Sequence, residues 1–289
     1  MKKNTIIAAL LSLFVLVSVL SSCSDDDDNV PGAPEQNKNI QLKNDAKLGN
    51  ILTDSAGNTL YFFTPDVTSP TKCVEGCLIV WPLFYKANPS LGTGLDQKDF
   101  GVADRPDGKK QTTYKGSPLY YYEPDQAPGD TKGEGLENAW FVAKPDYTIM
   151  IGHAQLIGED NVSYTGNYQP GVAPFTPFFT TADGITLYTF TKDAPNKNNY
   201  TSETDQAKNA VWPIFAGSKT LVVPSVLNKA DFTTITVFGN PQLVYKGAPL
   251  YTFGRDTGRG STKGVSVPTP GIWPVATDPK IAFIPPTAP

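Results

Sequence analysis

The stretch Leu60-Tyr-Phe-Phe-Thr-Pro-Asp66 decides the fold, because the same phrase returns three more times along the chain. The other copies are Leu119-Tyr-Tyr-Tyr-Glu-Pro-Asp125, Leu187-Tyr-Thr-Phe-Thr-Lys-Asp193 and Leu250-Tyr-Thr-Phe-Gly-Arg-Asp256. Their shared pattern is Leu-Tyr-x-aromatic-x-x-Asp, and recurrence of this kind indicates a repeat architecture. Each copy is followed by one of the chain's four tryptophans, which are Trp81, Trp140, Trp212 and Trp273.

The four copies also pair at a higher level. The phrase Tyr-Lys-Gly-x-Pro, which begins at Tyr114 and Tyr245, introduces the second and fourth copies only. We therefore expect a tandem duplication of one β-hairpin-rich unit that holds two half-repeats, so that the body contains four half-repeats. The first unit covers residues 45–150, the second covers residues 172–289, and residues 151–171 join them.

Each half-repeat is expected to be a hairpin, in which a short strand and a glycine turn lead into the aromatic strand. Alternation along a strand places the tyrosine and the next aromatic residue on one face, which we predict to be the buried one. These residues are Tyr61 and Phe63, Tyr120 and Tyr122, Tyr188 and Phe190, and Tyr251 and Phe253. The fold class is mainly β, either closed as a four-bladed, propeller-like body or packed as two successive small β domains. Short helices are expected near residues 73–80 and 203–211.

Two roles fit the aspartate that ends each copy. It suits a loop cap, in which the carboxylate accepts backbone N–H groups where the strand ends. The alternative is binding of a ligand or Ca²⁺ by the same carboxylates. The residues concerned are Asp66, Asp125, Asp193 and Asp256.

The N-terminus has the pattern of a secretion signal. Residues 1–22 contain two lysines, an apolar run and the small residues Ser21 and Ser22 directly before Cys23. This pattern predicts a lipoprotein signal peptide and lipidation of Cys23, where two or three acyl chains such as palmitate would hold the membrane. An ordinary signal peptide with an incidental cysteine is the alternative. The acidic run 25–28 is either a signal for export to the outer face of the outer membrane or a solvated spacer.

Residues 23–44 are expected to form an acidic disordered tether, because they contain few large apolar side chains. The chain's net charge of −4 becomes −6 when Lys2 and Lys3 leave with the signal peptide. A body without clustered lysine and arginine is not expected to bind nucleic acid.

The two copies of Tyr-x-aromatic-x-x-Asp per unit are accompanied by further motifs. They are Cys73-x-x-x-Cys77 shortly before Trp81, the phrase Tyr-Lys-Gly-x-Pro-Leu-Tyr, the glycine-rich stretch 127–135 and then Trp140. Together they resemble the secreted lipoprotein repeat family of unknown function, described as predicted lipoproteins with a Yx(FWY)xxD motif. The resemblance implies an exported, membrane-anchored bacterial protein and brings no activity or catalytic residue. The second unit departs from the pattern, because Thr204 and Lys208 stand where the first unit has its cysteines.

Cys73 and Cys77 are the only thiols that remain after lipidation of Cys23. An even count in an oxidising compartment predicts a disulfide. A redox-active pair is the alternative, although no lysine or histidine stands adjacent to lower a thiol pKa. We expect no metal site, because the chain has a single histidine, His153, to complete one.

The remaining motifs indicate no reaction. No nucleophile elbow, dinucleotide-binding motif or P-loop is found, and His153 is expected to be structural, so we predict no catalytic residue, no cofactor and no enzyme. The leading hypothesis is a non-enzymatic binding or scaffolding module for a protein or saccharide partner. The alternative is an envelope redox or electron-transfer accessory protein that uses the cysteine pair or a bound cofactor. Aromatic residues that serve the core or a binding surface are Tyr85, Tyr121, Tyr122, Tyr147 and the four tryptophans.

Overall fold

The computed structural model describes residues 38–68 and 71–283, which lie in one compact unit spanning residues 36–289. The signal segment, Cys23 and the beginning of the predicted tether lie outside the described residues. Within the described ranges, no helix combines the length and the apolar character needed to cross a membrane.

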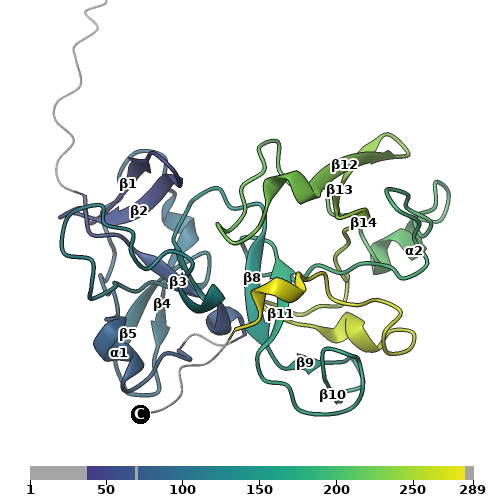
Figure 1. The fold of residues 1–289 in the computed structure, drawn as a ribbon, viewed down its shortest axis with the longest axis horizontal. Helices are drawn as coiled ribbons and strands as arrows, with labels where there is room; N and C mark the ends of the chain where they lie inside the picture. Colours follow the sequence, from purple (N-terminus) through teal and green to yellow (C-terminus); the bar gives the residue numbers. More distant parts are fainter. Residues whose placement is uncertain (1–37, 69–70, 284–289) are drawn as a thin grey trace, which may run out of the picture. The chain divides into compact units, whose positions relative to one another are not determined.

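The described residues form short antiparallel strands with little helix, which confirms the mainly β fold class (Figure 1). The strands are β1 (Ile40–Asp45), β2 (Gly49–Asp54), β3 (Tyr61–Phe63), β4 (Phe100–Asp104), β5 (Lys110–Tyr114), β6 (Ser117–Pro118), β7 (Trp140–Val142), β8 (Met150–Ala154), β9 (Leu156–Ile157), β10 (Ser163–Tyr164), β11 (Thr176–Thr180), β12 (Phe232–Val237), β13 (Asn240–Tyr245) and β14 (Ala248–Pro249). The helices are α1 (Cys77–Val80) and α2 (Gln206–Val211), both inside the ranges expected from the sequence. Short 3₁₀ turns are η1 (Thr64–Val67), η2 (Gln97–Asp99), η3 (Leu136–Asn138), η4 (Lys229–Asp231), η5 (Lys263–Ser266) and η6 (Pro279–Ile281).

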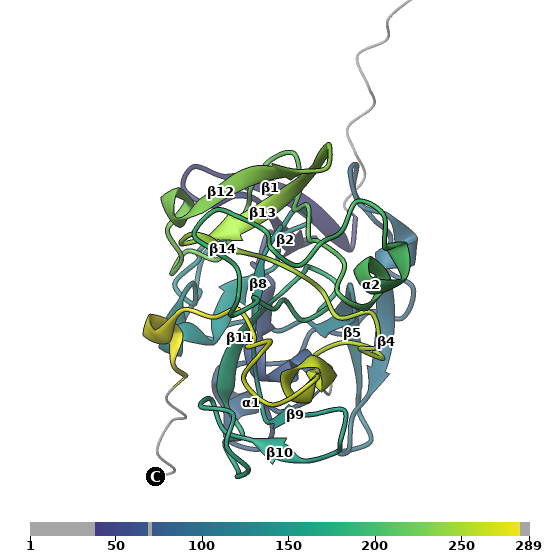
Figure 2. The same cartoon turned by 90° about the vertical axis from the view of Figure 1, so that its right-hand side faces the viewer.

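The strands of the described residues form six separate sheets of two or three strands each. These sheets close into neither a barrel nor a propeller, so the propeller-like closure is not confirmed. The sheet β12-β13-β14 is seen most clearly in Figure 2, and the sheet β4-β5-β6 has the same strand order in the first unit.

The Tyr-Lys-Gly phrases make the tight turns of these two sheets. Lys115 and Gly116 have φ values of 48° and 78°, and Lys246 and Gly247 have φ values of 47° and 84°. Two consecutive positive φ values are required by the hairpin turn that matches strand twist, and glycine meets this requirement without strain.

The aromatic phrase does not continue its local hairpin. The local hairpin ends at Leu60, whose amide donates to the Leu52 carbonyl over 3.0 Å, whereas β3 pairs with β7, so that Phe63 lies opposite Trp140. All three residues of β3 are buried, and such a strand needs packing partners on both faces that a local hairpin cannot supply.

One of the expected boundaries is wrong. The tether 23–44 is ordered from Ile40, because β1 pairs along its whole length with β2 and Ile40 is fully buried. Ile40 and Leu42 alternate as strand residues do, and the low overall hydrophobicity of the tether hid this pattern. The joining segment 151–171 supplies most of β8 together with β9 and β10.

The two units share one hydrophobic core. Strand β8 pairs with β11 of the second unit, and all five of its residues are buried. One cluster of buried side chains joins Phe141 and Ile149 to Phe179, Leu187 and Leu243. The body is therefore one packed structure, and the picture of two successive independent domains does not describe it.

Candidate functional site

The tyrosines of the two half-repeats meet in the centre of each unit. The Tyr61 amide donates to the Tyr120 carbonyl over 2.9 Å, and the Tyr120 amide returns a bond of 3.1 Å to the Tyr61 carbonyl. Tyr188 and Tyr251 exchange the same two bonds, each of 2.9 Å. A reciprocal pair of this kind relates the two half-repeats of a unit by local two-fold symmetry.

The side chains are exchanged as well. The Tyr61 hydroxyl donates to Asp125 Oδ2 over 2.6 Å, and the Tyr120 hydroxyl donates to Asp66 Oδ2 over 2.7 Å. Each motif tyrosine therefore bonds the motif aspartate of the other half-repeat. We call such a reciprocal set a clasp.

The second unit contains the same clasp. The Tyr188 hydroxyl donates to Asp256 Oδ2 over 2.8 Å, and the Tyr251 hydroxyl donates to Asp193 Oδ2 over 2.7 Å. The four motif copies are thus used in two equivalent pairs.

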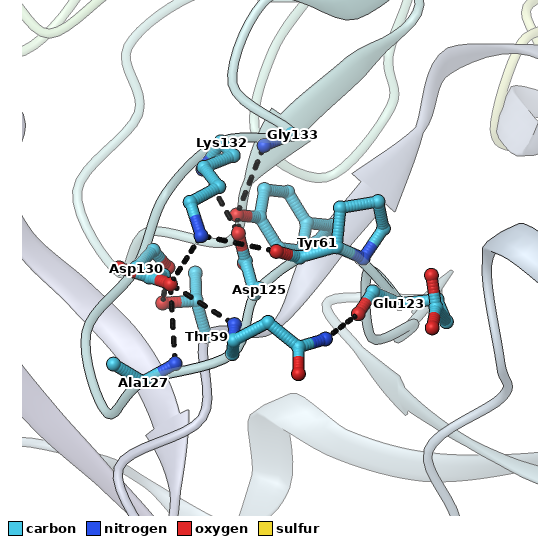
Figure 3. A network of polar contacts seen from close by, with 10 residues as sticks. Thr59, Tyr61, Glu123, Asp125, Ala127, Asp130, Lys132 and Gly133 are labelled. Carbon is cyan, nitrogen blue, oxygen red and sulfur yellow. Dashed lines mark hydrogen bonds and ion pairs between the residues drawn. The ribbon is translucent and has the colours of Figure 1, made fainter.

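The second oxygen of each aspartate closes the loop that follows it. Asp125 Oδ1 accepts the Lys132 amide over 3.0 Å, as Figure 3 shows. The corresponding donors are the amides of Thr71 and Lys72 to Asp66, of Asn199 to Asp193 and of Lys263 to Asp256. Each carboxylate therefore holds its own loop and the partner half-repeat at once.

A second carboxylate stiffens the loop drawn in Figure 3. Asp130 Oδ2 accepts the amides of Gln126 and Ala127 over 2.9 and 3.1 Å and forms an ion pair of 2.7 Å with Lys132 Nζ. The Thr59 hydroxyl donates to the Asp130 carbonyl over 2.7 Å, which ties this loop to the segment before Tyr61.

The tryptophans stack face to face between the paired half-repeats. The ring centroids of Trp81 and Trp140 lie 3.7 Å apart with 2° between the planes. Phe63 stacks on the outer face of Trp140 at 4.1 Å, and Tyr122 stacks on the outer face of Trp81 at 4.2 Å. The aromatic residue two positions after the motif tyrosine thus supplies the outer ring of a four-ring stack.

The same stack recurs in the second unit. Trp212 and Trp273 lie 3.8 Å apart with 6° between their planes. Phe190 packs on Trp273 at 4.3 Å, and Phe253 packs on Trp212 at 4.4 Å with a tilt of 38°. Each of the four tryptophans is at most 6% exposed, so these rings form core.

One glycine in each unit lets the backbone approach the stack. A Cβ atom at Gly133 would come within 2.7 Å of Trp81 and 2.9 Å of Tyr61. A Cβ atom at Gly264 would come within 2.6 Å of Trp212 and 2.9 Å of Tyr188. Any side chain at these positions would push apart the tyrosine and tryptophan that make the clasp and the stack.

Burial sets the protonation of the clasp. It raises the pKa of Asp66 and of Asp256 to about 6, and it raises the pKa of Asp125 and of Asp193 above the usual value. Burial together with the aspartate partner raises the pKa of all four motif tyrosines well above 10. The tyrosines are therefore neutral at physiological pH and donate to carboxylates, which suits a permanent contact.

Cys73 and Cys77 form the predicted disulfide at the start of α1. Cys73 is fully buried, and Cys77 is half-buried beside the tryptophan stack. In the second unit Asp205 caps α2 by accepting the Lys208 amide over 2.9 Å, so a side-chain cap stands near the position of the missing bridge.

His153 joins the two units. Its Nε2 lies 2.9 Å from the Ile281 carbonyl, which can only accept, and this contact places the ring proton on Nε2. Its Nδ1 then accepts the Thr64 hydroxyl over 2.7 Å. Burial lowers the pKa of His153 to about 4, so the imidazole is neutral at physiological pH. Both of its ring nitrogens form hydrogen bonds.

The four other tyrosines considered for binding occupy different environments. Tyr147 is 5% exposed and donates to the Val142 carbonyl, whereas the half-buried Tyr121 donates to Asp54 Oδ2 over 2.9 Å. Tyr122 is the outer ring described above, and Tyr85 is 38% exposed.

Sequence reasoning missed the half-buried Arg259 and the buried Lys144. Arg259 donates to the Lys115 carbonyl and to Ser117 Oγ, which binds a loop of the second unit to the hairpin of the first. Lys144 lies near the boundary of the units and is 8% exposed. No motif marks either residue. The signal that the sequence offered is a difference between the units, because the position of Arg259 is occupied by Pro128 in the first unit and the position of Lys144 is occupied by Thr277 in the second.

Within the described ranges, no group of three or more His, Cys, Asp or Glu side chains is arranged to hold a metal ion. The model of a family described as a secreted repeat of unknown function matches residues 44–84 and 101–144, which together hold the β-rich halves of the first unit. No curated protein and no solved structure matches the chain. The resemblance inferred from the motifs is thereby confirmed over these two stretches, which are similar to the family of secreted repeats of unknown function.

Proposed function

We propose that the protein is an exported, lipid-anchored envelope protein whose body is a tandem duplication and acts as a non-enzymatic binding or scaffolding module. Export is supported by the family description as a secreted repeat and by the disulfide, which suits an oxidising compartment. Lipid on Cys23 would attach the body to the cell envelope, in the outer membrane and exposed at the surface.

The observation that carries this proposal is the mutual use of the motif side chains. All four motif tyrosines donate to motif aspartates, and all four tryptophans are stacked in the core. The most chemically distinctive residues of the repeat therefore build a rigid body. A rigid body that presents loops at its surface is typical of binding modules.

The partner that we propose is a saccharide or a protein, besides the membrane that the lipid holds. Nucleic acid is disfavoured by the net charge of −4, since phosphate neutralisation needs clustered lysine and arginine.

The redox alternative rests on one observation, which is that Cys77 of the disulfide is half-buried and not sealed in the core. Exchange with an external thiol would require such access. A Cys73→Ser variant separates the two functions, because it removes a redox role entirely and costs a binding module only some stability.

The experiment uses the mature protein released from membranes. Mass spectrometry of its N-terminal peptide should find acyl chains on Cys23, and a Cys23→Ser variant should leave the membrane fraction. Absorbance and metal analysis should give the same result for the wild type and for Cys73→Ser, and neither protein should catalyse repeated turnover of a thiol–disulfide substrate. A turnover activity or exchange activity that vanishes in Cys73→Ser would refute the non-enzymatic proposal.

A further inference from the structure

A cavity of about 750 Å³ opens where the β1–β2 turn meets segments 144–146 and 222–229. Its wall combines residues of both units, and its volume lies in the range of small-molecule sites, about 300 to 1,000 Å³. Leu48, Val222 and Leu227 supply apolar wall, while Asn44 and Ser225 supply polar groups. A cavity with this mixed lining can hold a small polar molecule.

Lys144 is the unusual member of this wall. The residue is only 8% exposed, yet within the described ranges it forms no ion pair within 4 Å. Its Nζ lies 5.3 Å from the centroid of the Tyr147 ring. Burial lowers the pKa of Lys144, while the carboxylates of Glu134, Asp146 and Asp45 act on it at longer range and oppose this shift.

The charges around Lys144 favour a single negative charge in the cavity. Lys47 and Lys229 also line it, and Asp45 and Asp146 are the acidic residues of the lining, so the wall carries one excess positive charge. The carboxylate of Asp45 is already engaged by the amides of Lys47 and Leu48, both over 2.8 Å.

Glu134 lies near this region but does not line the cavity. Its Oε2 accepts the Val142 amide over 2.7 Å, and burial raises its pKa. Its charge acts on Lys144 without an ion pair within 4 Å, so the Lys144 ammonium can still form a direct contact with a ligand.

We propose that this cavity binds a small molecule that carries one carboxylate, which pairs with the Lys144 ammonium while the rest of the ligand contacts the apolar wall. This inference rests on the proposed binding function and names its ligand class. An acidic sugar and the C-terminus of a short peptide share this chemistry. Phosphate is disfavoured, because it would bring nearly two negative charges to a wall with one excess positive charge.

The test measures binding by saturation-transfer NMR and calorimetry on the whole mature protein. The probes are glucuronate with glucose as its neutral match, and acetyl-Ala-Ala with its C-terminal amide as the neutral match. Inorganic phosphate is the third arm. We expect at least one carboxylate probe to bind and its neutral match to fail, and the binding carboxylate identifies the source.

The variant Lys144→Met should weaken that binding by about tenfold or more, because a hydrogen bond to a charged group is lost. Lys229→Met, on an exposed part of the wall, should weaken it less, and it tests the site even if Lys144→Met fails to fold. Lys192→Met, an exposed lysine outside the cavity, should leave binding unchanged.

Equal binding of the neutral probes, tighter binding of phosphate, or unchanged affinity in both wall variants would overturn the inference. So would the absence of binding by both carboxylates, which would leave the broader binding proposal intact. Conversion of a probe, seen as new NMR signals, would instead refute the non-enzymatic function.

Discussion

The two units hold the same clasp but protect it in different ways. In the first unit the segment before Trp81 is closed by the Cys73–Cys77 bridge, whereas in the second unit the equivalent segment before Trp212 begins with a side-chain cap on α2. The hydrogen bonds of the two clasps nevertheless agree within about 0.2 Å. The clasp therefore depends on the tyrosines, the aspartates and the tryptophan stack, and the disulfide is a local addition.

The loops that follow the clasp differ in a second way. Where the first unit has Pro128, the second has Arg259, which reaches across to the Lys115 carbonyl over 2.5 Å. Both units therefore keep the clasp. The loop position after the clasp differs between them, and in the second unit it holds the arginine that contacts the first unit.

The largest expected effect breaks the stack in one unit at a time. Trp140→Ala and Trp273→Ala should each lower the free energy of unfolding by about 3 to 5 kcal/mol, because each leaves a large cavity between stacked rings. Chemical denaturation of both variants is the measurement. A loss of unfolding free energy below about 1 kcal/mol for one of the two variants alone would show that the two units do not depend equally on their stacks.

The contact between the units should respond to acid. His153 has a lowered pKa, so its contribution to stability is complete above pH 6.5 and is lost as the pH falls toward 4. The full loss amounts to about 3 kcal/mol. Denaturation of the wild type and of His153→Gln at several pH values measures it, and an unchanged pH slope in the variant would contradict the buried neutral ring.

The clasps should respond with the opposite sign in nearly the same range. Asp66 and Asp256 have raised pKa values, so their contribution is complete below pH 3.8 and is lost as the pH rises toward 6. The loss is about 2 to 3 kcal/mol for each. Asp66→Asn and Asp256→Asn should each remove an equal part of the pH dependence of the unfolding free energy, measured in the His153→Gln background. A pH dependence that neither change affects would show that the two aspartates do not cause it.

The smallest effect on stability is expected from the feature that only one unit has. Cys73→Ser should lower the free energy of unfolding by at most about 2 kcal/mol, because the bridge closes a very short loop. Thermal unfolding of the variant and of the reduced wild type checks this. A loss as large as that of Trp140→Ala would show that the first clasp depends on the bridge.

The repeat, the mainly β class, the disulfide and both short helices could be predicted from local sequence. The exchange of partners could not, because Tyr61 and Asp125 are 64 residues apart and no local rule decides which aspartate a tyrosine meets. One signal was available: a buried tyrosine hydroxyl needs a partner, and each motif brings one tyrosine and one aspartate.

The error at the tether has a physical cause. Low average hydrophobicity suggested a disordered chain, but Ile40 enters the core through period-two alternation in a polar context. Strand β8 is buried by contacts with both units, which only the packed fold supplies. Lys144 escaped notice because a lone lysine is normally a surface residue.

The central claim is that motif tyrosines bond the aspartate of the other half-repeat, and a pair of double-mutant cycles in the second unit tests it most directly. The cycle of Tyr188→Phe with Asp256→Asn joins bonded residues, and the cycle of Tyr188→Phe with Asp193→Asn joins residues of one motif that make no bond to each other. We predict a coupling energy of about 1 kcal/mol or more for the first cycle and below about 0.5 kcal/mol for the second. Coupling confined to the second cycle, or equal in both, would contradict the exchanged clasp.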